Sequence, residues 1–400
     1  MAVAGVAGGD ALRLLDGLLA PAGRALLAEV MAAPVERAGE LGAAERLRAR
    51  WPADLVAAAF AQRELRLAAR AKFGLAERML FTRPGLEQAS AEAAARHRAR
   101  RYQGVAAVAD LCCGIGGDLT ALAPGRAVVA VDVDPVHLRM AAENAAVHGA
   151  GDGVEVVLAD ARSAPLDRVE GAFVDPARRA GGRRFGPVTS EPPLAWCLGL
   201  ADRVAAVGIK AAPGLPLDLV PAGWEVEFLA DGRDLKEAAL WSPALATAMR
   251  RATVLPGGET LTPAPGPAVA CAPPGGYLLD PNPAVTRAGA VETLARTLGA
   301  WKLDGRIAFL SADEPPRTPF GRPLRVEASM PYALKRLRAS LRALGVGAVD
   351  IRRRGLAGDV DDLRRRLRLD GEHRATVILT RVLDQPWALV CSDLDAPPLS

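Results

Sequence analysis

Apolar side chains recur every three to four residues through the first hundred positions of the chain. The repeat is clearest from Leu55 to Phe60 and from Leu65 to Phe73, and this spacing places apolar side chains on one face of a helix. T-R-P-G at residues 82–85 predicts a break, and a helix is expected again over residues 87–101. The pattern therefore predicts a helical region over residues 1–100.

Short β-branched runs alternate with helical stretches over residues 101–258. Strands that alternate with helices form βαβ units, in which right-handed crossovers join parallel strands. Such units predict an α/β fold with a Rossmann-like, doubly wound sheet of about six or seven strands. The predicted strands are Val105–Leu111, Ala127–Val131, Val154–Leu158, Gly171–Val174, Val204–Ile209, Glu225–Leu229 and Ala238–Trp241.

Residues 259–276 are rich in proline and glycine, which interrupt regular structure, and they predict a linker between domains. Residues 277–400 mix strand-like and helical runs, which is typical of an α+β domain. The elements predicted in this last domain are strands at Arg325–Ala328, Val349–Arg353 and Ala375–Thr380 and helices at Tyr332–Leu344 and Val360–Leu367.

Composition narrows the class of protein. Half of the 400 residues are hydrophobic, but no run of about eighteen uncharged apolar residues predicts a membrane span. The five cysteines are scattered without a C-x-x-C pair, so they predict neither a disulfide framework nor a zinc site. The first residues lack the basic, apolar and cleavage segments of a signal peptide. We expect a cytoplasmic protein with reduced thiols, no metal and no membrane contact.

The net charge is +4, and arginine supplies 45 of the 50 basic side chains. Heavy use of arginine and alanine is typical of a GC-rich genome, so only local clustering argues for a nucleic-acid partner. Residues 331–374 hold twelve Lys or Arg against six Asp or Glu. This cluster fits the neutralisation of phosphate groups, and it fits a solvated arginine-rich face equally well.

Candidate chemistry begins with D-L-C-C-G-I-G-G-D at residues 110–118, which follows the first predicted strand. Glycines suit this turn because it is tight and because the backbone must approach a ligand. A helix is expected from about residue 119, and its first N–H groups are free to bind that ligand. Cys112 and Cys113 are interpreted as small packing residues of the loop rather than as a thiol site.

Acids follow the next two predicted strands. Asp132 lies eighteen residues after Gly114, where nucleotide-binding sheets place a carboxylate on the ribose hydroxyls; the alternative is a solvated acid at the strand end. Asp160 is placed to accept from an adenine amine, or else it caps a helix. Before the sheet, E-Q-A-S at residues 87–90 either folds over the ligand pocket or starts a helix.

The order of these motifs resembles that of class I S-adenosylmethionine-dependent methyltransferases. The first family motif matches residues 110–118, the second Asp132, the third Asp160, and the fourth V-D-P-A-R-R at residues 174–179. The G-x-G-x-x-G fingerprint of NAD enzymes does not match the spacing here. The resemblance implies S-adenosylmethionine as the cofactor, with the opening acid near its methionine portion. The cofactor-binding residues that it implies are Asp110, Cys112, Gly114, Gly116, Gly117, Asp118, Asp132 and Asp160.

The fourth motif departs from that of amine-methylating relatives, which carry Asn/Asp-Pro-Pro-aromatic. Ala177 and Arg178 replace the second proline and the aromatic residue, so stacking of a base on that ring is not expected. D-P-x-R instead resembles RNA methyltransferases that act on uracil C5 and need a cysteine nucleophile. K-A-A-P-G at residues 210–214 has no thiol, which argues against C5 chemistry and leaves Cys197 and Cys271 as the alternative thiols.

A nitrogen or oxygen acceptor needs only positioning and the loss of a proton. We therefore expect Asp175, with Pro176, to hold or deprotonate the acceptor. Lys210 either binds a substrate phosphate, polarises a base carbonyl, or is a surface lysine at a strand end. Arg178 and Arg179 are expected to contact phosphate. The hypothesis is methylation of a nitrogen in an RNA base.

Residues 281–380, with R-R-R-G at 352–355, resemble the THUMP-like domain appended to a group of bacterial class I methyltransferases. THUMP domains proper present RNA to their enzyme, so the resemblance implies an RNA substrate, tRNA first and rRNA next. It implies Arg352, Arg353 and Arg354 as substrate contacts. Two alternatives stay open: a methyltransferase of a small molecule or protein whose C-terminal part is a lid or dimer surface, and a non-catalytic module that binds cofactor and RNA.

Overall fold

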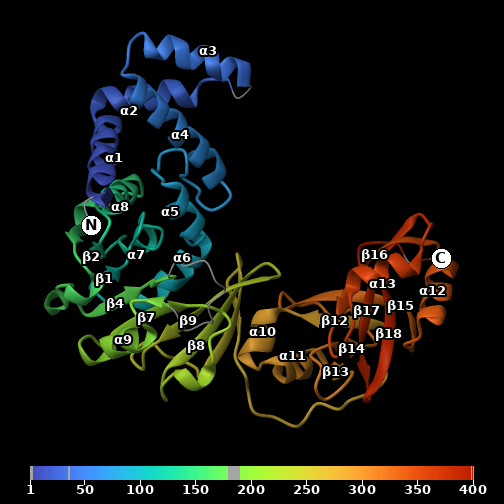
Figure 1. Ribbon diagram of the computed structural model, residues 1–400. Helices are drawn as coiled ribbons and strands as arrows, with labels where there is room; N and C mark the ends of the chain where they lie inside the picture. Colours follow the sequence, from blue (N-terminus) through green and yellow to red (C-terminus); the bar gives the residue numbers. More distant parts are fainter. Residues whose placement is uncertain (1–2, 35–36, 179–189, 398, 400) are drawn as a thin grey trace. The chain divides into compact units, whose positions relative to one another are not determined.

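The computed structural model describes residues 3–34, 37–178, 190–397 and 399. The chain divides into two compact units (Figure 1). The first comprises residues 1–225 and 238–247, and the second comprises residues 226–237 and 248–400. The chain leaves the first unit and returns to it along two consecutive strands, β8 (Glu225–Asp231) and β9 (Asp234–Trp241).

Most of the described residues among the first hundred are helical, as predicted. The helices are α1 (Val3–Leu19), α2 (Pro21–Met31), α3 (Arg37–Arg48), α4 (Ala53–Ala69), α5 (Arg83–Gln88) and α6 (Glu92–Ala99), followed by the 3-10 turn η1 (Arg100–Tyr102). The predicted break at residues 82–85 is wrong, because the Thr82 side chain caps α5 by accepting from the Gly85 N–H at 3.0 Å. The interruptions lie at residues 70–82, between α4 and α5, and at residues 89–91, between α5 and α6.

The first unit contains the predicted doubly wound sheet, with strand order β9-β7-β4-β1-β2-β3. All of its strands are parallel except β9, which runs antiparallel to β7. From β3 to β7 the order is that of a nucleotide-binding sheet, so the carboxyl ends of five neighbouring strands meet at one edge. These strands are β1 (Ala107–Leu111), β2 (Ala127–Asp132), β3 (Val154–Leu158), β4 (Gly171–Val174) and β7 (Ala206–Ala211).

The connections between these strands are uneven in length. A full helix, α8, joins β2 to β3, and its first turn is capped by the Asp134 side chain. Between β3 and β4 the described chain forms only 3-10 turns, so Val156 and Leu158 of β3 stay exposed. The elements are α7 (Leu119–Leu122), α8 (Pro135–Val147), η2 (Gly151–Gly153), η3 (Ala161–Ser163), η4 (Leu166–Arg168), β5 (Ala177–Arg178), β6 (Ser190–Glu191), α9 (Leu194–Gly199), η5 (Leu200–Asp202) and η6 (Leu217–Leu219).

A fully buried asparagine fastens the helical region to the sheet. Asn144, on α8, donates from Nδ2 to the carbonyls of Leu80 at 3.0 Å and Ile115 at 2.8 Å. Its Oδ1 accepts from the Leu80 N–H at 2.8 Å. Around it Phe73, Ile115 and other apolar side chains form one hydrophobic cluster. The helical region and the sheet therefore share a core inside the first unit.

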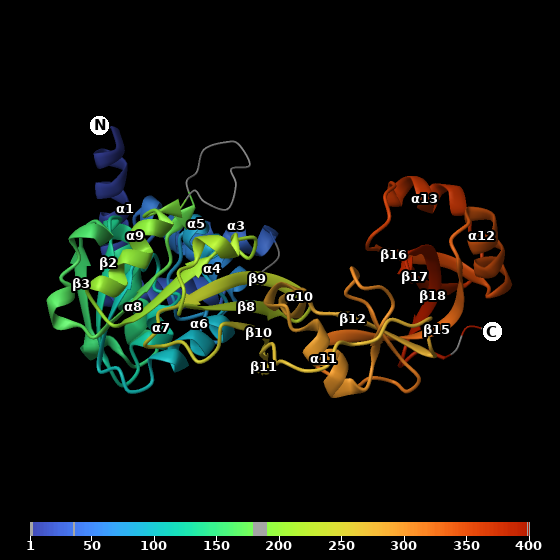
Figure 2. The same cartoon turned by 90° about the horizontal axis from the view of Figure 1, so that it is seen from below.

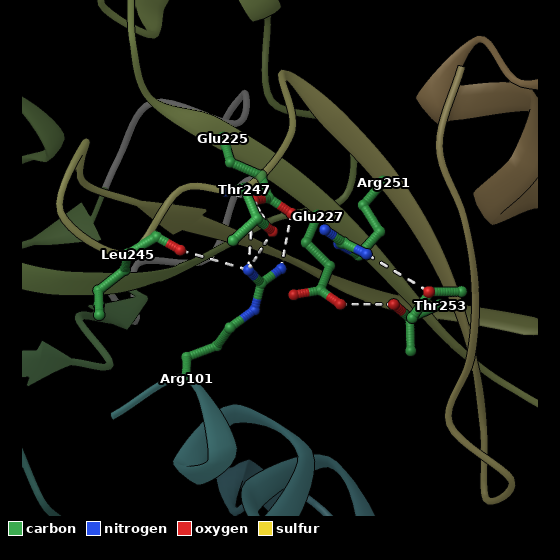
Figure 3. A network of polar contacts seen from close by, with 8 residues as sticks. Arg101, Glu225, Glu227, Leu245, Thr247, Arg251 and Thr253 are labelled. Carbon is green, nitrogen blue, oxygen red and sulfur yellow. Dashed lines mark hydrogen bonds and ion pairs between the residues drawn. The ribbon is translucent and has the colours of Figure 1, made fainter. Parts of the chain in front are cut away.

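The second unit begins with β8, β10 (Arg250–Leu255) and β11 (Glu259–Leu261). β10 pairs parallel with β8 and antiparallel with β11. Buried Glu227 of β8 accepts from the Thr253 hydroxyl at 2.5 Å (Figure 3). Two helices follow, α10 (Pro283–Ala288) and α11 (Val291–Leu298), and Arg287 of α10 lies over the Phe228 ring at 5.1 Å.

A second sheet completes this unit, with strand order β13-β14-β12-β15-β18-β17-β16. It is antiparallel except for the parallel pair of β16 and β17, and α12 and α13 cover one of its faces (Figure 2). This mixed arrangement is the predicted α+β class. The elements are β12 (Tyr277–Pro281), β13 (Trp301–Lys302), β14 (Leu310–Ala312), β15 (Gly321–Pro331), α12 (Leu334–Ala343), β16 (Val346–Arg353), α13 (Val360–Leu367), β17 (His373–Val382) and β18 (Gln385–Asp393). Within the described residues, no helix has the length and apolar character needed to cross a bilayer.

Replacing Asn144 with alanine leaves the Leu80 N–H and two buried carbonyls without their side-chain partner. A buried polar group without a partner costs about 1–3 kcal/mol, so we expect the free energy of unfolding to fall by about 3 kcal/mol. Urea unfolding measures this change. The neighbouring Glu143→Gln, which breaks ion pairs with Arg24 and Arg139, serves as the control, with an expected loss under about 1 kcal/mol. Equal losses in the two variants would contradict this assignment.

Candidate active site

The glycine loop between β1 and α7 follows a path that few residues can adopt. Cys112, Gly114 and Gly116 have φ values of +61°, +53° and +84°. A Cβ atom on Gly116 would lie 3.0 Å from the Ala141 Cα, so this position accepts only glycine in both conformation and space. The Gly114 N–H donates to Asp132 Oδ2 at 2.8 Å, which ties the loop to the end of β2.

Asp110, near the end of β1, is a buried carboxyl group with an unsatisfied oxygen. The residue is 1% exposed, and its Oδ2 has no hydrogen-bond partner among the described residues. Burial raises the pKa of Asp110 well above its usual value, the negative charges of Asp118, Asp175 and Asp132 raise it further, and Arg98 opposes them. A cation placed beside this oxygen would satisfy it, which suits an ammonium or sulfonium ligand.

The Asp118 carboxylate is paired within the protein. Arg98 of α6 donates to Asp118 Oδ1 from Nε at 2.9 Å and from a terminal nitrogen at 2.5 Å, and both side chains are buried. The Arg98 guanidinium also lies 5.4 Å from the centre of the Phe173 ring. This pair orients the start of α7, and cofactor contact by Asp118 stays a prediction. Sequence reasoning missed Arg98. This residue belongs to a basic run, R-H-R-A-R-R at residues 96–101, whose composition is typical of a solvated surface.

Arg101 in the same run is also committed to an internal partner. Figure 3 shows its guanidinium pointing toward Glu225, Thr247 and the Leu245 carbonyl. The shortest of these bonds joins an Arg101 terminal nitrogen to Glu225 Oε1 at 2.6 Å, and Glu225 is fully buried. An unpaired buried carboxylate would be costly, so this arginine has a structural role.

The acids after β2 and β3 make local bonds. Asp132 accepts from the Gly114 N–H and, through Oδ1, from the Asp134 N–H at 2.9 Å. Asp160 caps the turn η3 by accepting from the Arg162 N–H at 2.8 Å. This is the helix-capping alternative given for Asp160 in the sequence analysis. Asp160 is also exposed and ion-paired with the Arg162 side chain at 3.1 Å. Cofactor contact by these two acids stays a prediction.

Asp175 and Lys210 are brought together from two neighbouring strands. Asp175 follows β4, Lys210 lies near the end of β7, and Val174 pairs with Ile209 in the parallel register. Lys210 Nζ donates to Asp175 Oδ2 at 2.6 Å, and the side chains are 17% and 31% exposed. Lys210 is therefore not an unattached surface lysine. The pair sits at the sheet edge that carries the glycine loop, with half-buried Pro176 next to it.

The predicted arginine contacts have different surroundings. The backbone of Arg178 lies in β5, while its side chain and the whole of Arg179 fall outside the described residues. In the second unit, Arg352 pairs with Asp350 at 3.3 Å and Arg353 is exposed. Arg354 pairs with Asp280 at 2.9 Å and lies over the Phe309 ring at 4.9 Å.

The loop thiols are held in the protonated form. Burial, followed by the charge of Asp132, raises the pKa of Cys112, and burial also raises that of Cys113. Burial raises the pKa of Cys197 to about 12. A thiol needs to ionise to act as a nucleophile, so these three are unsuited to that role. The described residues also hold no group of three or more His, Cys, Asp or Glu that could bind a metal ion.

A lysine that sequence reasoning missed fixes the segment covering the glycine loop. Lys72 Nζ donates to the carbonyls of Leu86 at 2.7 Å, Glu87 at 3.2 Å and Ala89 at 2.9 Å. A Cβ atom on Gly117 would lie 3.4 Å from the Ala89 Cβ, which is ordinary contact. E-Q-A-S thus ends α5 and packs on the loop. No sequence signal pointed to Lys72, because its partners are backbone carbonyls.

Family comparisons match three parts of the chain. The family described as "RNA cap guanine-N2 methyltransferase" matches residues 105–179, "THUMP domain-like" matches residues 321–393, and a domain of unknown function matches residues 11–69. The chain is 40% identical over 326 residues to S-adenosylmethionine-dependent methyltransferases from two strains of Mycobacterium tuberculosis, covering 78% of this chain and 88% of each relative. A crystal structure described as a methyltransferase, from Porphyromonas gingivalis W83, shares the fold with a TM-score of 0.70 and 21% identity, covering 86% of this chain and 92% of that one.

The raised pKa of Asp110, together with its predicted contact to the cofactor, predicts that cofactor binding depends on pH. A cation favours the ionised carboxylate, so binding of S-adenosylmethionine should release a proton and tighten as the pH rises through the pKa of Asp110. The stability of the cofactor-free protein changes with pH in the opposite direction. The unfolded state loses the Asp110 proton at a lower pH than the folded state does. The free energy of unfolding therefore falls as the pH rises from the unfolded pKa to the folded pKa of Asp110.

Titration calorimetry in two buffers of different ionisation enthalpy counts the protons released on binding. The range from about pH 5.5 to about pH 7 lies below the usual pKa of an α-amino group, so the amine of the cofactor does not contribute. Asp110→Asn should remove the proton release and weaken binding. Proton release that is the same in Asp110→Asn and the unchanged protein would contradict the role given to this acid.

Lys72→Met keeps the length of the side chain and removes its donors to the covering segment. We expect the Kd for S-adenosylmethionine to rise about tenfold, equal to about 1.4 kcal/mol, because the loop loses its support. Titration calorimetry measures the change. Lys236→Met, at an exposed lysine on β9, is the matched control and should bind like the unchanged protein. Unaltered affinity in Lys72→Met would show that the segment does not support the loop.

Proposed function

Because this chain belongs to the class I S-adenosylmethionine-dependent methyltransferases with a THUMP-like domain, we propose that it methylates a nitrogen of an RNA base, with tRNA the first candidate and rRNA the next. The enzyme class and the cofactor follow from the family. The acceptor atom and the RNA are the proposal. The observation that carries it is the Lys210–Asp175 pair at the sheet edge beside the glycine loop.

The residues of the first unit fit this cofactor. Asp110 offers a buried, unsatisfied carboxylate oxygen to a cationic ligand, and the loop at Gly116 has no side chain to block a close approach. Asp132 ends β2 where a ribose would lie. The further contacts proposed are the loop positions Cys112, Gly114 and Gly117 and the acids Asp118 and Asp160.

When bound, the cofactor would supply a methyl group on a sulfonium sulfur, whose C–S bond breaks to leave a neutral thioether, so the protein has only to present the acceptor. Asp175 accepts a hydrogen bond from an amine of the base and takes its proton as the nitrogen is methylated. Lys210, held 2.6 Å from Asp175, donates to a carbonyl or ring nitrogen of the same base. Pro176 restricts the backbone after Asp175.

The thiol chemistry argues for nitrogen rather than carbon as the acceptor. Carbon C5 of uracil needs a covalent adduct with a thiolate, and burial keeps Cys112, Cys113 and Cys197 protonated. Cys271 lies in the second unit. Nitrogen acceptors need no such adduct, so a carboxylate beside a lysine is sufficient for them.

An RNA substrate is supported by the two domain matches and by charge. The family descriptions name an RNA cap guanine for residues 105–179 and a THUMP-like domain for residues 321–393. Twelve basic residues against six acids lie within residues 331–374. We include Arg178, Arg179, Arg352, Arg353 and Arg354 as proposed phosphate contacts.

We retain the sequence-based division as part of the proposal: a helical region at 1–100, the methyltransferase domain at 101–258, a linker at 259–276 and the THUMP-like domain at 277–400. We place the enzyme in the cytoplasm, where its RNA substrates are found. Free cysteines, of which the described residues contain five, suit that reducing compartment.

Nucleoside mass spectrometry of tRNA and rRNA from a deletion strain and its parent should reveal one methylated nucleoside missing from the deletion strain. Asp175→Ala should fail to restore it and should lower kcat by about 10²–10⁴, with the Kd for cofactor within about twofold. Asp202→Ala, at an exposed acid of η5, is the control and should restore it. Identical RNA in the two strains would exclude the RNA substrate and favour a protein, a small molecule or a non-catalytic role. Full activity of Asp175→Ala would remove this residue from the mechanism.

A further inference from the structure

A cavity of about 770 Å³ lies in the second unit, apart from any residue placed in the methyl-transfer site. Its polar lining includes three guanidinium groups and one carboxylate, from Arg306, Arg354, Arg381 and Asp384. Arg306 precedes β14, Arg354 follows β16, Arg381 lies near the end of β17, and Asp384 lies in the tight turn from β17 to β18. Three separate segments of the chain thus converge on one arginine-lined space.

The acids around this cavity use only part of the hydrogen-bonding capacity of its arginines. One carboxylate oxygen, Asp384 Oδ1, accepts from Arg381 Nε at 3.2 Å, from an Arg381 terminal nitrogen at 2.7 Å, and from Arg306. The bonds from Arg381 hold the pKa of Asp384 below its usual value. Arg354 has its own partner in Asp280 at 2.9 Å. Asp304 Oδ1 also lies 4.0 Å from Arg306 Nε, so three guanidinium groups face three carboxylates. A guanidinium group carries more N–H donors than one carboxylate accepts, which leaves donors for a further anion.

A buried acid holds two of the arginine-bearing segments in place. Asp304, 3% exposed, accepts from the Arg306 N–H at 2.9 Å and from the Asp384 N–H at 2.8 Å. The turn itself has two non-glycine residues with positive φ, Leu383 at +46° and Asp384 at +67°. Such a backbone is costly and persists only where its surroundings hold it. The two segments that carry Arg306 and Arg381 are therefore fixed to one another through their backbones.

An exposed aromatic residue lies at the same end of the sheet. Tyr332 follows β15, is 37% exposed, and donates its N–H to the Pro386 carbonyl at 3.0 Å. Pro386 in turn pairs with Arg381 across β17 and β18. With strands about 4.8 Å apart, the backbones of Tyr332 and Arg381 are separated by about 10 Å. Aromatic rings beside guanidinium groups suit an unpaired nucleotide, whose base stacks while its phosphate binds.

We propose that this cavity binds a backbone phosphate of single-stranded RNA, with a neighbouring base stacked on Tyr332. The proposal rests on the proposed function, since it assigns one contact of the RNA substrate. Arg306 and Arg381 donate to the phosphate oxygens, and Asp384 competes with the phosphate for the same donors.

Fluorescence anisotropy of the full chain with labelled single-stranded RNA, between about 50 and about 200 mM salt, tests the site. The double variant Arg306→Gln with Arg381→Gln should bind at least about tenfold more weakly. Its plot of log affinity against log salt should be shallower by about 0.7, because one phosphate contact is lost. Arg46→Gln with Arg48→Gln, at exposed arginines of α3, is the matched control and should retain the affinity and slope of the unchanged protein.

Asp384→Asn separates a binding role from a structural one. Removing the competing carboxylate should tighten RNA binding severalfold, whereas a purely structural role predicts weaker binding. If the double arginine variant fails to fold, Tyr332→Ser supplies the second test and should weaken single-stranded binding without changing the salt slope.

Several results would overturn the assignment. One is a double variant that binds RNA with unchanged affinity and slope. Another is a pair of results: inorganic phosphate stabilises the unchanged protein, and the arginine substitutions do not alter RNA binding. Together these results would make this a site for free phosphate. If the unchanged chain binds no RNA at all, the proposed function itself fails, so the two failures are distinguishable.

Discussion

The close approach of the glycine loop to helix α8 is the constraint on which the site depends. A side chain at Gly116 would collide with Ala141, so only glycine in the left-handed conformation allows the loop to pass. On this path the Gly114 N–H reaches Asp132, and the segment held by Lys72 packs on the loop. One packing contact therefore sets the positions of the loop, of the acid after β2 and of the covering segment.

Electrostatics then decides what this edge of the sheet can bind. Several carboxylates gather there, and like charges in a buried place repel one another. Asp118 is paired with Arg98 and Asp175 with Lys210, which relieves most of that repulsion. Asp110 keeps an unsatisfied oxygen and a raised pKa. An edge built in this way favours a cationic ligand, and the proposed function assigns the Asp175 pair to the acceptor.

The arginine-rich composition has more than one physical meaning in this protein. Arg98 and Arg101 neutralise buried acids, so they contribute to folding and are withdrawn from any partner. Arg306 and Arg381 instead share one exposed carboxylate. Guanidinium groups that share an acid retain N–H donors for another anion. The number of arginines therefore does not indicate whether this protein binds an anionic partner. The acids paired with each arginine are the better indication.

The amino-acid sequence by itself determined the fold class, the glycine loop and the acids that follow the strands. Strands at 154–158 and 171–174 and the helix at 360–367 are predicted to the residue, because periodicity and punctuation are local properties. Strands such as β12 and β18 were not predicted, because prolines, turn residues and mixed burial obscure the hydrophobic pattern there. Only the tertiary structure paired Arg98 with Asp118 and brought Lys72 to its three carbonyls, because these contacts join positions 14 to 20 residues apart. A linear pattern reports how buried each residue is, and it does not report which partner that residue meets.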